Sequence, residues 1–439
     1  MATLAVLAAC GGNGVPSGSA SLVPPAQASA PAADDAGPAA SDAGATASAG
    51  GAAAPSPSPT AAAGPPVTAP PLTAYTGDAF FDPGDAPAGA PGEIIRSRPV
   101  TVAIDGAEAW QVLHWSRTAE DQPVAVSATV VAPTAATSSP RAVLAWAHGT
   151  TGMGDQCSIS AGVADGSAPD LTIVNGAVDQ GLTVVLPDYQ GLGTPGDHAY
   201  LVGQAEGRNV LDGIRAATHL DGSGATPDSK AVVWGHSQGG QAAAFTAELQ
   251  PTYAPDVHLV GAVAGAPASD LTAASTKTAT AADPAYRGYL PMVIVGYRAG
   301  YPALAADDQL LTDAGREALA RVDGQCLDET LGTFSDEDPA PLLAGLPIDQ
   351  PRWRQVLAAN RAGDRPTSVP IFLYHGGADD LVSPQLSAEL LARYCELGVT
   401  ASRTVYPDTD HVSVIAAAYA DIGVYLQARL AGEPAPNSC

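Results

Sequence analysis

The chain has 439 residues, five cysteines and a formal net charge of -26 at pH 7. This length allows one large domain with a sizeable core. Because an acidic surface repels phosphate groups, the charge argues against nucleic-acid binding and is typical of a soluble exported protein. The sequence contains no apolar run of about 18 residues or more, so it predicts no membrane-spanning helix.

The N-terminal part of the chain predicts export. Residues 1–10 form a short apolar stretch that ends in Leu-Ala-Ala-Cys and is similar to a bacterial lipoprotein signal, although it lacks the usual basic residues. We expect lipidation at Cys10, and an anchor at the cell surface through this lipid alone. A plain secretory signal with an incidental cysteine is the alternative. Residues 11–74 are almost all Ala, Pro, Gly, Ser and Thr, which predicts a disordered tether.

The remaining residues, 75–439, are expected to fold as an α/β domain. The first apolar runs, Val100–Ile104, Gln111–Arg117 and Val124–Val131, surround turn signals and predict antiparallel strands. Later runs alternate with stretches of helical periodicity such as Gly207–His219 and Gly240–Leu249, which indicates a mostly parallel sheet with helices on both faces. The strands expected in this second part are Ala142–Ala147, Thr183–Leu186, Ala231–Trp234, Leu259–Ala264, Ile371–Tyr374 and Ser402–Tyr406.

The region from about 268 to 367 interrupts this alternation. It is rich in Ala, Leu, Asp and Arg and predicts several short helices between two strands. Its length favours a helical cap inserted over an active site, because the connections between strands and helices in such folds are usually much shorter. Ordinary helices that cover the sheet are the alternative.

The strongest chemical signal is Gly235-His-Ser237-Gln-Gly239, which follows an apolar strand and precedes a helix-forming run. A serine between a strand and a helix in a G-x-S-x-G motif is raised on a sharp turn, where the residues two positions away must be very small. The sequence therefore predicts that Ser237 is a nucleophile. The backbone N–H group of Gln238, at the start of the helix, is expected to stabilise the oxyanion.

A serine hydroxyl needs a base, and the base is in turn oriented by an acid. In α/β-hydrolases both follow the serine along the chain. Asp379 comes after the strand Ile371–Tyr374 and a glycine turn, and we favour it as the acid over its neighbour Asp380. His411 follows the last strand just before a helix and is expected to be the base.

A second oxyanion donor is expected from the strand end His148-Gly149-Thr150, with the N–H of Thr150 as first candidate and that of Gly149 next. A simple glycine turn is the alternative. The remaining histidines are expected to have structural or surface positions, and His375 is too close in sequence to Asp379 to act as the base. We interpret His198 as structural too, although its loop could border the site.

Four cysteines besides Cys10 suggest two disulfides in an exported protein, with three possible pairings. The last residue, Cys439, would hold the C-terminus in place, and Cys395 is its nearest partner in sequence. We therefore expect the pairs Cys395–Cys439 and Cys157–Cys326. No cysteines have the spacing of a zinc site, and no metal or other cofactor is expected.

With these motifs in place, the chain resembles the secretory lipase family typified by Candida lipase A, in its bacterial branch. The matching segments lie in the family's order, and they are His148-Gly-Thr-Thr-Gly, Asp155-Gln-Cys157, Pro187-Asp-Tyr-Gln-Gly-Leu-Gly, Gly235-His-Ser-Gln-Gly-Gly-Gln, His375-Gly-Gly-Ala-Asp-Asp-Leu-Val and His411. The resemblance implies the α/β-hydrolase fold, the triad Ser237, Asp379 and His411, and a helical cap between two core strands. An acidic side chain in the oxyanion hole of the fungal members is replaced here by the segment His148-Gly149-Thr150.

We therefore expect an exported serine ester hydrolase, a lipase or esterase, that acts as a monomer on small-molecule or lipid esters. A polyester depolymerase or a serine peptidase with the same triad is the first alternative. A lipoprotein that kept the fold only for binding is the second, but it predicts a damaged triad, and the three expected residues are all present.

Overall fold

The computed structural model describes residues 71–72, 74–168, 170–272, 287–335 and 341–439. The expected signal and lipidation site at residues 1–10 and the expected tether up to residue 70 lie outside this part of the chain. Two stretches of the expected cap, 273–286 and 336–340, lie outside it as well.

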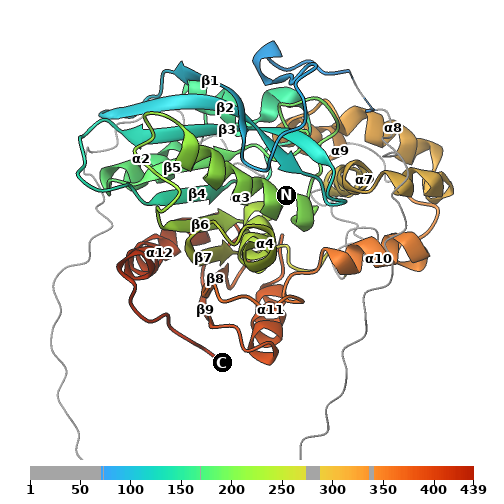
Figure 1. The fold of residues 1–439 in the computed structure, drawn as a ribbon. Helices are drawn as coiled ribbons and strands as arrows, with labels where there is room; N and C mark the ends of the chain where they lie inside the picture. Colours follow the sequence, from blue (N-terminus) through green and yellow to red (C-terminus); the bar gives the residue numbers. More distant parts are fainter. Residues whose placement is uncertain (1–70, 73, 169, 273–286, 336–340) are drawn as a thin grey trace, which may run out of the picture.

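A nine-stranded sheet forms the centre of the molecule, with the strand order β1-β2-β3-β5-β4-β6-β7-β8-β9. The first three strands are joined antiparallel, β3 pairs antiparallel with β5, and all later neighbours are parallel. This is the mostly parallel α/β arrangement expected from the sequence (Figure 1). The strands are β1 Ile94–Val100, β2 Ala107–Arg117, β3 Pro123–Pro133, β4 Val143–Ala147, β5 Thr183–Pro187, β6 Ala231–His236, β7 Leu259–Gly265, β8 Ile371–Gly376 and β9 Ala401–Tyr406.

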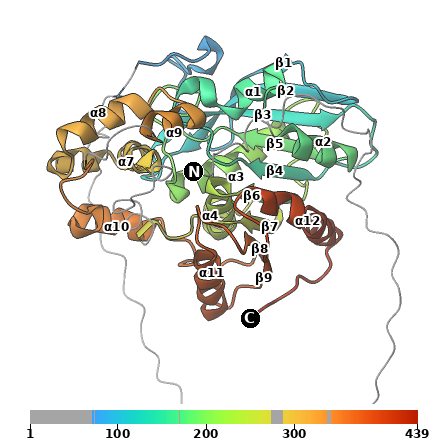
Figure 2. The ribbon, with the colours of Figure 1, turned by 180° about the vertical axis from the view of Figure 1, so that it is seen from behind.

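Helices cover both faces of the sheet. Alternate residues of the central strands point to opposite faces, so that Ala145 packs in one hydrophobic cluster and Trp146 in the other. One face carries α3 (Gly203–His219), α4 (Gln238–Tyr253) and α11 (Pro384–Glu396), and Figure 1 looks onto its first two helices. The opposite face carries α1 (Ile159–Asp165), α2 (Leu171–Asp179) and α12 (Ser413–Ala431), of which α12 is nearest in Figure 2.

The first strand corrects the expectation from the sequence. It spans Ile94–Val100 and pairs with β2, whereas the expected strand Val100–Ile104 overlaps it only at Val100. Val102 and Ile104 still pack against the core, which explains their alternating apolar pattern. Their backbone lies in the connection that must reverse the chain before Ala107, so it joins no strand.

The segment between β7 and β8 is helical, as the sequence predicted for this region. Its apolar residues form a cluster of their own with Met153, which follows β4, and with the segment Ala199–Val202, which follows β5. The segment therefore packs on loops at the carboxyl ends of the parallel strands, and its helices lie together beyond one end of the sheet in both views (Figures 1 and 2). Its described elements are α7 Tyr289–Gly300, η3 Pro302–Leu310, α8 Asp313–Val322, α9 Leu327–Ser335, η4 Pro347–Asp349 and α10 Pro351–Ala359.

Two disulfides join distant parts of the chain, and they are the pairs expected from the sequence. Cys157 in the short helix η2 (Asp155–Cys157) is bonded to Cys326, just before α9. Cys395 in α11 is bonded to the C-terminal Cys439. In the described part of the chain, no helix is long and apolar enough to cross a membrane.

Candidate active site

The turn between β6 and α4 places Ser237 at the carboxyl end of the central strands. β6 is buried along its whole length, and Ser237 itself is partly exposed. Its φ of 61° and ψ of -120° form a conformation that non-glycine residues rarely adopt, and such strain is typical of functional turns. The N–H of Ser237 donates to the carbonyl of Gly265 (2.9 Å), which ties the turn to the end of β7.

Two glycines make this turn possible. A Cβ atom on Gly235 would lie 2.0 Å from the carbonyl oxygen of Gly239, and one on Gly239 would lie 1.8 Å from that of Ala147. Both distances are far below van der Waals contact, so neither position accepts a side chain. The sequence motif and the observed backbone thus have the same steric cause.

The loop that follows β4 lies against this turn. A Cβ atom on Gly149 would approach the carbonyl oxygen of His236 to 3.5 Å, and Gly149 and Thr150 are partly exposed. On the other side, the N–H of Gln238 belongs to the first turn of α4, where no intrahelical acceptor exists. The expected oxyanion donors therefore come from two adjacent segments beside Ser237.

His411 and Asp379 form a hydrogen-bonded pair on the loops after β9 and β8. The Nδ1 atom of His411 lies 2.7 Å from Oδ2 of Asp379, and the His411 ring centroid is 4.8 Å from that of His236, the residue before Ser237. Because an ionised carboxylate only accepts hydrogen bonds, Nδ1 carries the proton and Nε2 is left as the basic atom. Asp379 is buried, whereas its rival Asp380 is exposed.

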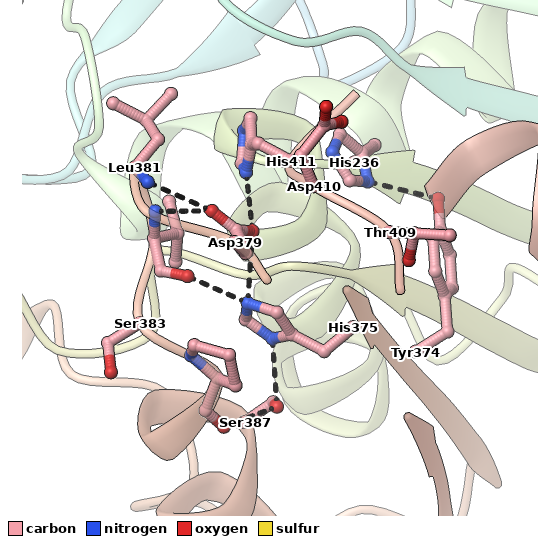
Figure 3. A network of polar contacts seen from close by, with 12 residues as sticks. His236, Tyr374, His375, Asp379, Leu381, Ser383, Ser387, Thr409, Asp410 and His411 are labelled. Carbon is pink, nitrogen blue, oxygen red and sulfur yellow. Dashed lines mark hydrogen bonds and ion pairs between the residues drawn. The ribbon is translucent and has the colours of Figure 1, made fainter. Parts of the chain in front are cut away.

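A second histidine holds the same carboxylate, and the sequence did not predict this contact. The fully buried His375 places Nε2 3.1 Å from Oδ2 of Asp379 and 2.9 Å from the carbonyl of Val382, and its Nδ1 faces the hydroxyl of Ser387 (Figure 3). With two acceptors in front of it, Nε2 is the protonated nitrogen. The spacing of four residues in His375-Gly-Gly-Ala-Asp379 is the signal that could have suggested a local contact.

These contacts determine the charge of Asp379. Burial by itself would raise the pKa of Asp379, but hydrogen bonds from His375 and His411 outweigh it and hold the pKa below its usual range. The other carboxylate oxygen, Oδ1, accepts from the backbone N–H groups of Leu381 and Val382 at 3.0 and 2.8 Å. Asp379 is therefore ionised at neutral pH and has a fixed orientation towards His411.

Three other histidines have the structural positions expected from the sequence. His236 packs locally and its Nδ1 lies 3.1 Å from the hydroxyl of Tyr374, as expected for a residue inside the turn. His148 is buried, and its ring packs at a tilt against that of Tyr189, with the ring centroids 4.5 Å apart. His198 is buried beside the side chain of Gln238, and thus borders the expected oxyanion donor. Among the described residues, no group of three or more His, Cys, Asp or Glu side chains is arranged to hold a metal ion.

Comparison with known protein families assigns the chain. The family model of secretory lipases matches residues 166–438, which is more than half of the chain and includes Ser237, Asp379 and His411. The chain belongs to the secretory lipase family. It is thus an exported lipase or esterase, a carboxylic ester hydrolase.

Relatives of this secretory lipase include fungal and bacterial proteins. Lipase 6 of Candida albicans is 26% identical over 393 residues, which cover 82% of each chain. A protein of Mycobacterium tuberculosis named as a probable inactive lipase is 28% identical over 386 residues, covering 81% of this chain and 82% of its own. The solved structure of Candida antarctica lipase A in its closed state has the same fold, with a TM-score of 0.71 at 22% identity, and the match covers 81% of this chain and 90% of the other.

Proposed function

We propose that this secretory lipase hydrolyses carboxylic esters through a triad of Ser237, His411 and Asp379. The observation that carries the proposal is the strained turn at Ser237, which lies beside a His411 ring whose Nδ1–H is held by an ionised, buried Asp379. In α/β-hydrolases this combination of turn, base and acid activates a serine hydroxyl.

In the proposed reaction, Oγ of Ser237 attacks the ester carbonyl carbon while Nε2 of His411 takes the hydroxyl proton. The negative charge that develops on the carbonyl oxygen is stabilised by the N–H of Gln238 and by that of Thr150 or Gly149. The C–O bond then breaks, the alcohol leaves with the proton from His411, and the acyl group stays on Ser237. A water molecule, activated by the same histidine, releases the carboxylic acid and restores the serine.

We infer lipid esters as the substrate class, because the chain belongs to a lipase family and because helices of the segment between β7 and β8 pack on loops at the site. These helices would act as the cap. An anchor at Cys10 would keep the monomeric enzyme at the cell surface. Polyesters or peptides bound by the same triad are the alternative substrates.

Hydrolysis of p-nitrophenyl esters with acyl chains from C2 to C16 tests the function. Ser237→Ala is expected to remove turnover down to a residual level, a loss of about 10⁴-fold or more in kcat, because it removes the hydroxyl that forms the acyl-enzyme in the proposed reaction. The wild-type profile over chain length separates an esterase from a lipase. Full activity of Ser237→Ala would refute the triad, and cleavage of peptides without any ester turnover would favour the peptidase alternative.

A further inference from the structure

A buried glutamate, Glu206, contacts the side chain of Gln238, whose backbone N–H is an expected oxyanion donor. Glu206 stands in the first turn of α3 and is 0% exposed. Its Oε1 atom accepts two hydrogen bonds, one from Nε2 of Gln238 (2.8 Å) and one from the backbone N–H of Leu201 (2.9 Å). In the part of the chain that the structure describes, no arginine, lysine or histidine forms an ion pair with it. Neither the sequence motifs nor the proposed mechanism uses this residue.

Glu206 contacts the side chain of Gln238, and the backbone N–H of Gln238 is the first expected oxyanion donor. The side-chain amide of Gln238 has two N–H bonds, and its nitrogen lies within reach of two acceptors, Oε1 of Glu206 and Nε2 of His198 (3.3 Å). Nδ1 of His198 is 3.0 Å from the carbonyl of Gln190, so this nitrogen carries the proton and Nε2 is left to accept. Glu206 and His198 thus fix the side chain of Gln238 from two directions.

The contact with Leu201 leads to the second candidate donor. Leu201 has a φ of 56°, a left-handed conformation that is costly for a leucine and needs a local contact to hold it. Its neighbour Tyr200 places its hydroxyl 2.9 Å from Oγ1 of Thr150. Glu206 therefore holds the loop at Leu201, and this loop contacts Thr150 through Tyr200. The carboxyl group of Glu206 is thus connected to both candidate donors, Gln238 and Thr150.

Two features favour the neutral form of the Glu206 carboxyl group. Its Oε2 atom is buried and has no hydrogen-bond partner among the described residues, which is unfavourable for an ionised carboxylate. Burial raises the pKa of Glu206 to about 8, against the smaller opposite effects of Gln238 and Leu201. A negative charge here would also oppose the oxyanion that Gln238 is expected to stabilise.

We propose that Glu206 is a positioning residue that holds both candidate oxyanion donors, Gln238 directly and Thr150 through the loop of Tyr200 and Leu201, and that it does so as an uncharged acid. The proposal rests on the proposed ester hydrolysis at Ser237. It adds a residue that no sequence motif marks, and it predicts a loss of activity at alkaline pH with a defined origin.

Two substitutions separate positioning from mere support of the fold. Glu206→Leu removes both acceptor contacts and is expected to lower kcat about 10²-fold with little change in KM, because displaced donors weaken stabilisation of the transition state more than substrate binding. Glu206→Gln keeps an acceptor oxygen for Gln238 and Leu201 and is expected to keep kcat within about threefold of wild type at pH 7.

The pH dependence of kcat separates the proposed role of Glu206 from a purely structural one. Wild-type kcat is expected to fall as pH rises through about 8, where the folded-state Glu206 ionises, whereas Glu206→Gln should keep a flat profile up to about pH 10. The other titratable groups around Glu206 stay neutral over this range, because burial lowers the pKa of two histidines to about 4 and raises that of three tyrosines. These groups are His148, His198, Tyr189, Tyr200 and Tyr297.

Glu248→Gln is the matched control. Glu248 is a second buried glutamate, near the end of α4, where it binds the N–H of Gly363 and the hydroxyl of Tyr394, and burial raises its pKa to about 7. Its replacement should leave the pH profile of kcat unchanged. The proposal is overturned if folded Glu206→Leu keeps wild-type kcat, or if Glu206→Gln retains the alkaline loss. Activity of Ser237→Ala in the same assay would instead refute the proposed function.

Discussion

At the scale of single residues, the geometry of the candidate site depends on the hydrogen bonds that hold the carboxylate of Asp379. Asp379 accepts hydrogen bonds from two histidines and two backbone N–H groups (Figure 3). Each of these donors stabilises the ionised form and restrains the direction in which Oδ2 points to His411. Asp380, one position further, is exposed and makes none of these contacts.

Substitutions of Asp379 and of its sequence neighbour Asp380 are therefore expected to have very different effects on kcat. Asp379→Asn should lower kcat by about 10³- to 10⁴-fold, because a neutral amide neither stabilises the imidazolium nor selects the productive tautomer of His411. Asp380→Asn makes the same chemical change on the surface and should leave kcat within about twofold of wild type. Steady-state kinetics with one p-nitrophenyl ester decides this, and equal losses in the two variants would contradict the assignment of the acid.

At the scale of elements, the close contact between β4, β6 and α4 positions the nucleophile. The first turn of α4 passes so near the end of β4 that Gly239 lies directly against the carbonyl of Ala147. This approach leaves Ser237 at the carboxyl end of β6 with a positive φ. The turn is thus stabilised by the packing of three elements and not by the local sequence alone.

A single methyl group tests this packing. Gly239→Ala would place a Cβ atom 1.8 Å from the carbonyl oxygen of Ala147, and the required backbone shift should cost about 1–3 kcal/mol of stability and displace Ser237 and Gln238. Gly345→Ala adds the same methyl group at an exposed position with no atom within 4 Å, so it should change neither the stability nor kcat. Thermal unfolding and kcat measure both effects. Wild-type stability and activity in Gly239→Ala would show that the turn is not sterically restricted.

At the scale of the whole molecule, a disulfide links the helical segment between β7 and β8 to the connection that follows β4. Cys157 and Cys326 are separated by 169 residues, while Cys395 and Cys439 are separated by 44. An isolated β-bridge between Gly152 and Cys326 lies beside the first disulfide. The expected cap is therefore held at the loop after β4, close to the candidate donors Gly149 and Thr150.

The two crosslinks should differ in their effect on stability. Replacing both Cys157 and Cys326 by serine opens the longer loop and is expected to lower the free energy of unfolding by roughly 1 kcal/mol more than the same change at Cys395 and Cys439. Activity should also fall more in the first variant, because that bond lies near the candidate site. Urea unfolding and ester hydrolysis under non-reducing conditions measure this, and a larger loss at the C-terminal pair would contradict the loop-length argument.

Several parts of this protein could be derived from the order of residues along the chain. The alternation of apolar runs with helical stretches predicted the parallel sheet, and the pattern Gly235-x-Ser237-x-Gly239 predicted the turn, since both reflect local backbone geometry. The first strand was misplaced because Val102 and Ile104 face the core from a connection, and burial alone produces the same apolar alternation as a strand.

Other features were decided only by the tertiary structure. His375 begins the motif that carries Asp379 but had no predicted role, and Glu206 belongs to no motif. The structure shows that His375 contacts the acid of the expected triad and that Glu206 contacts the residue after Ser237. Sequence determines which strand ends carry Ser237, Asp379 and His411, because each strand and the loop that follows it are local in the chain. The partners that surround them depend on packing between distant segments, which leaves no periodic signal in the chain. The same packing supplies the hydrogen bonds that lower the pKa of Asp379 and the burial that raises the pKa of Glu206.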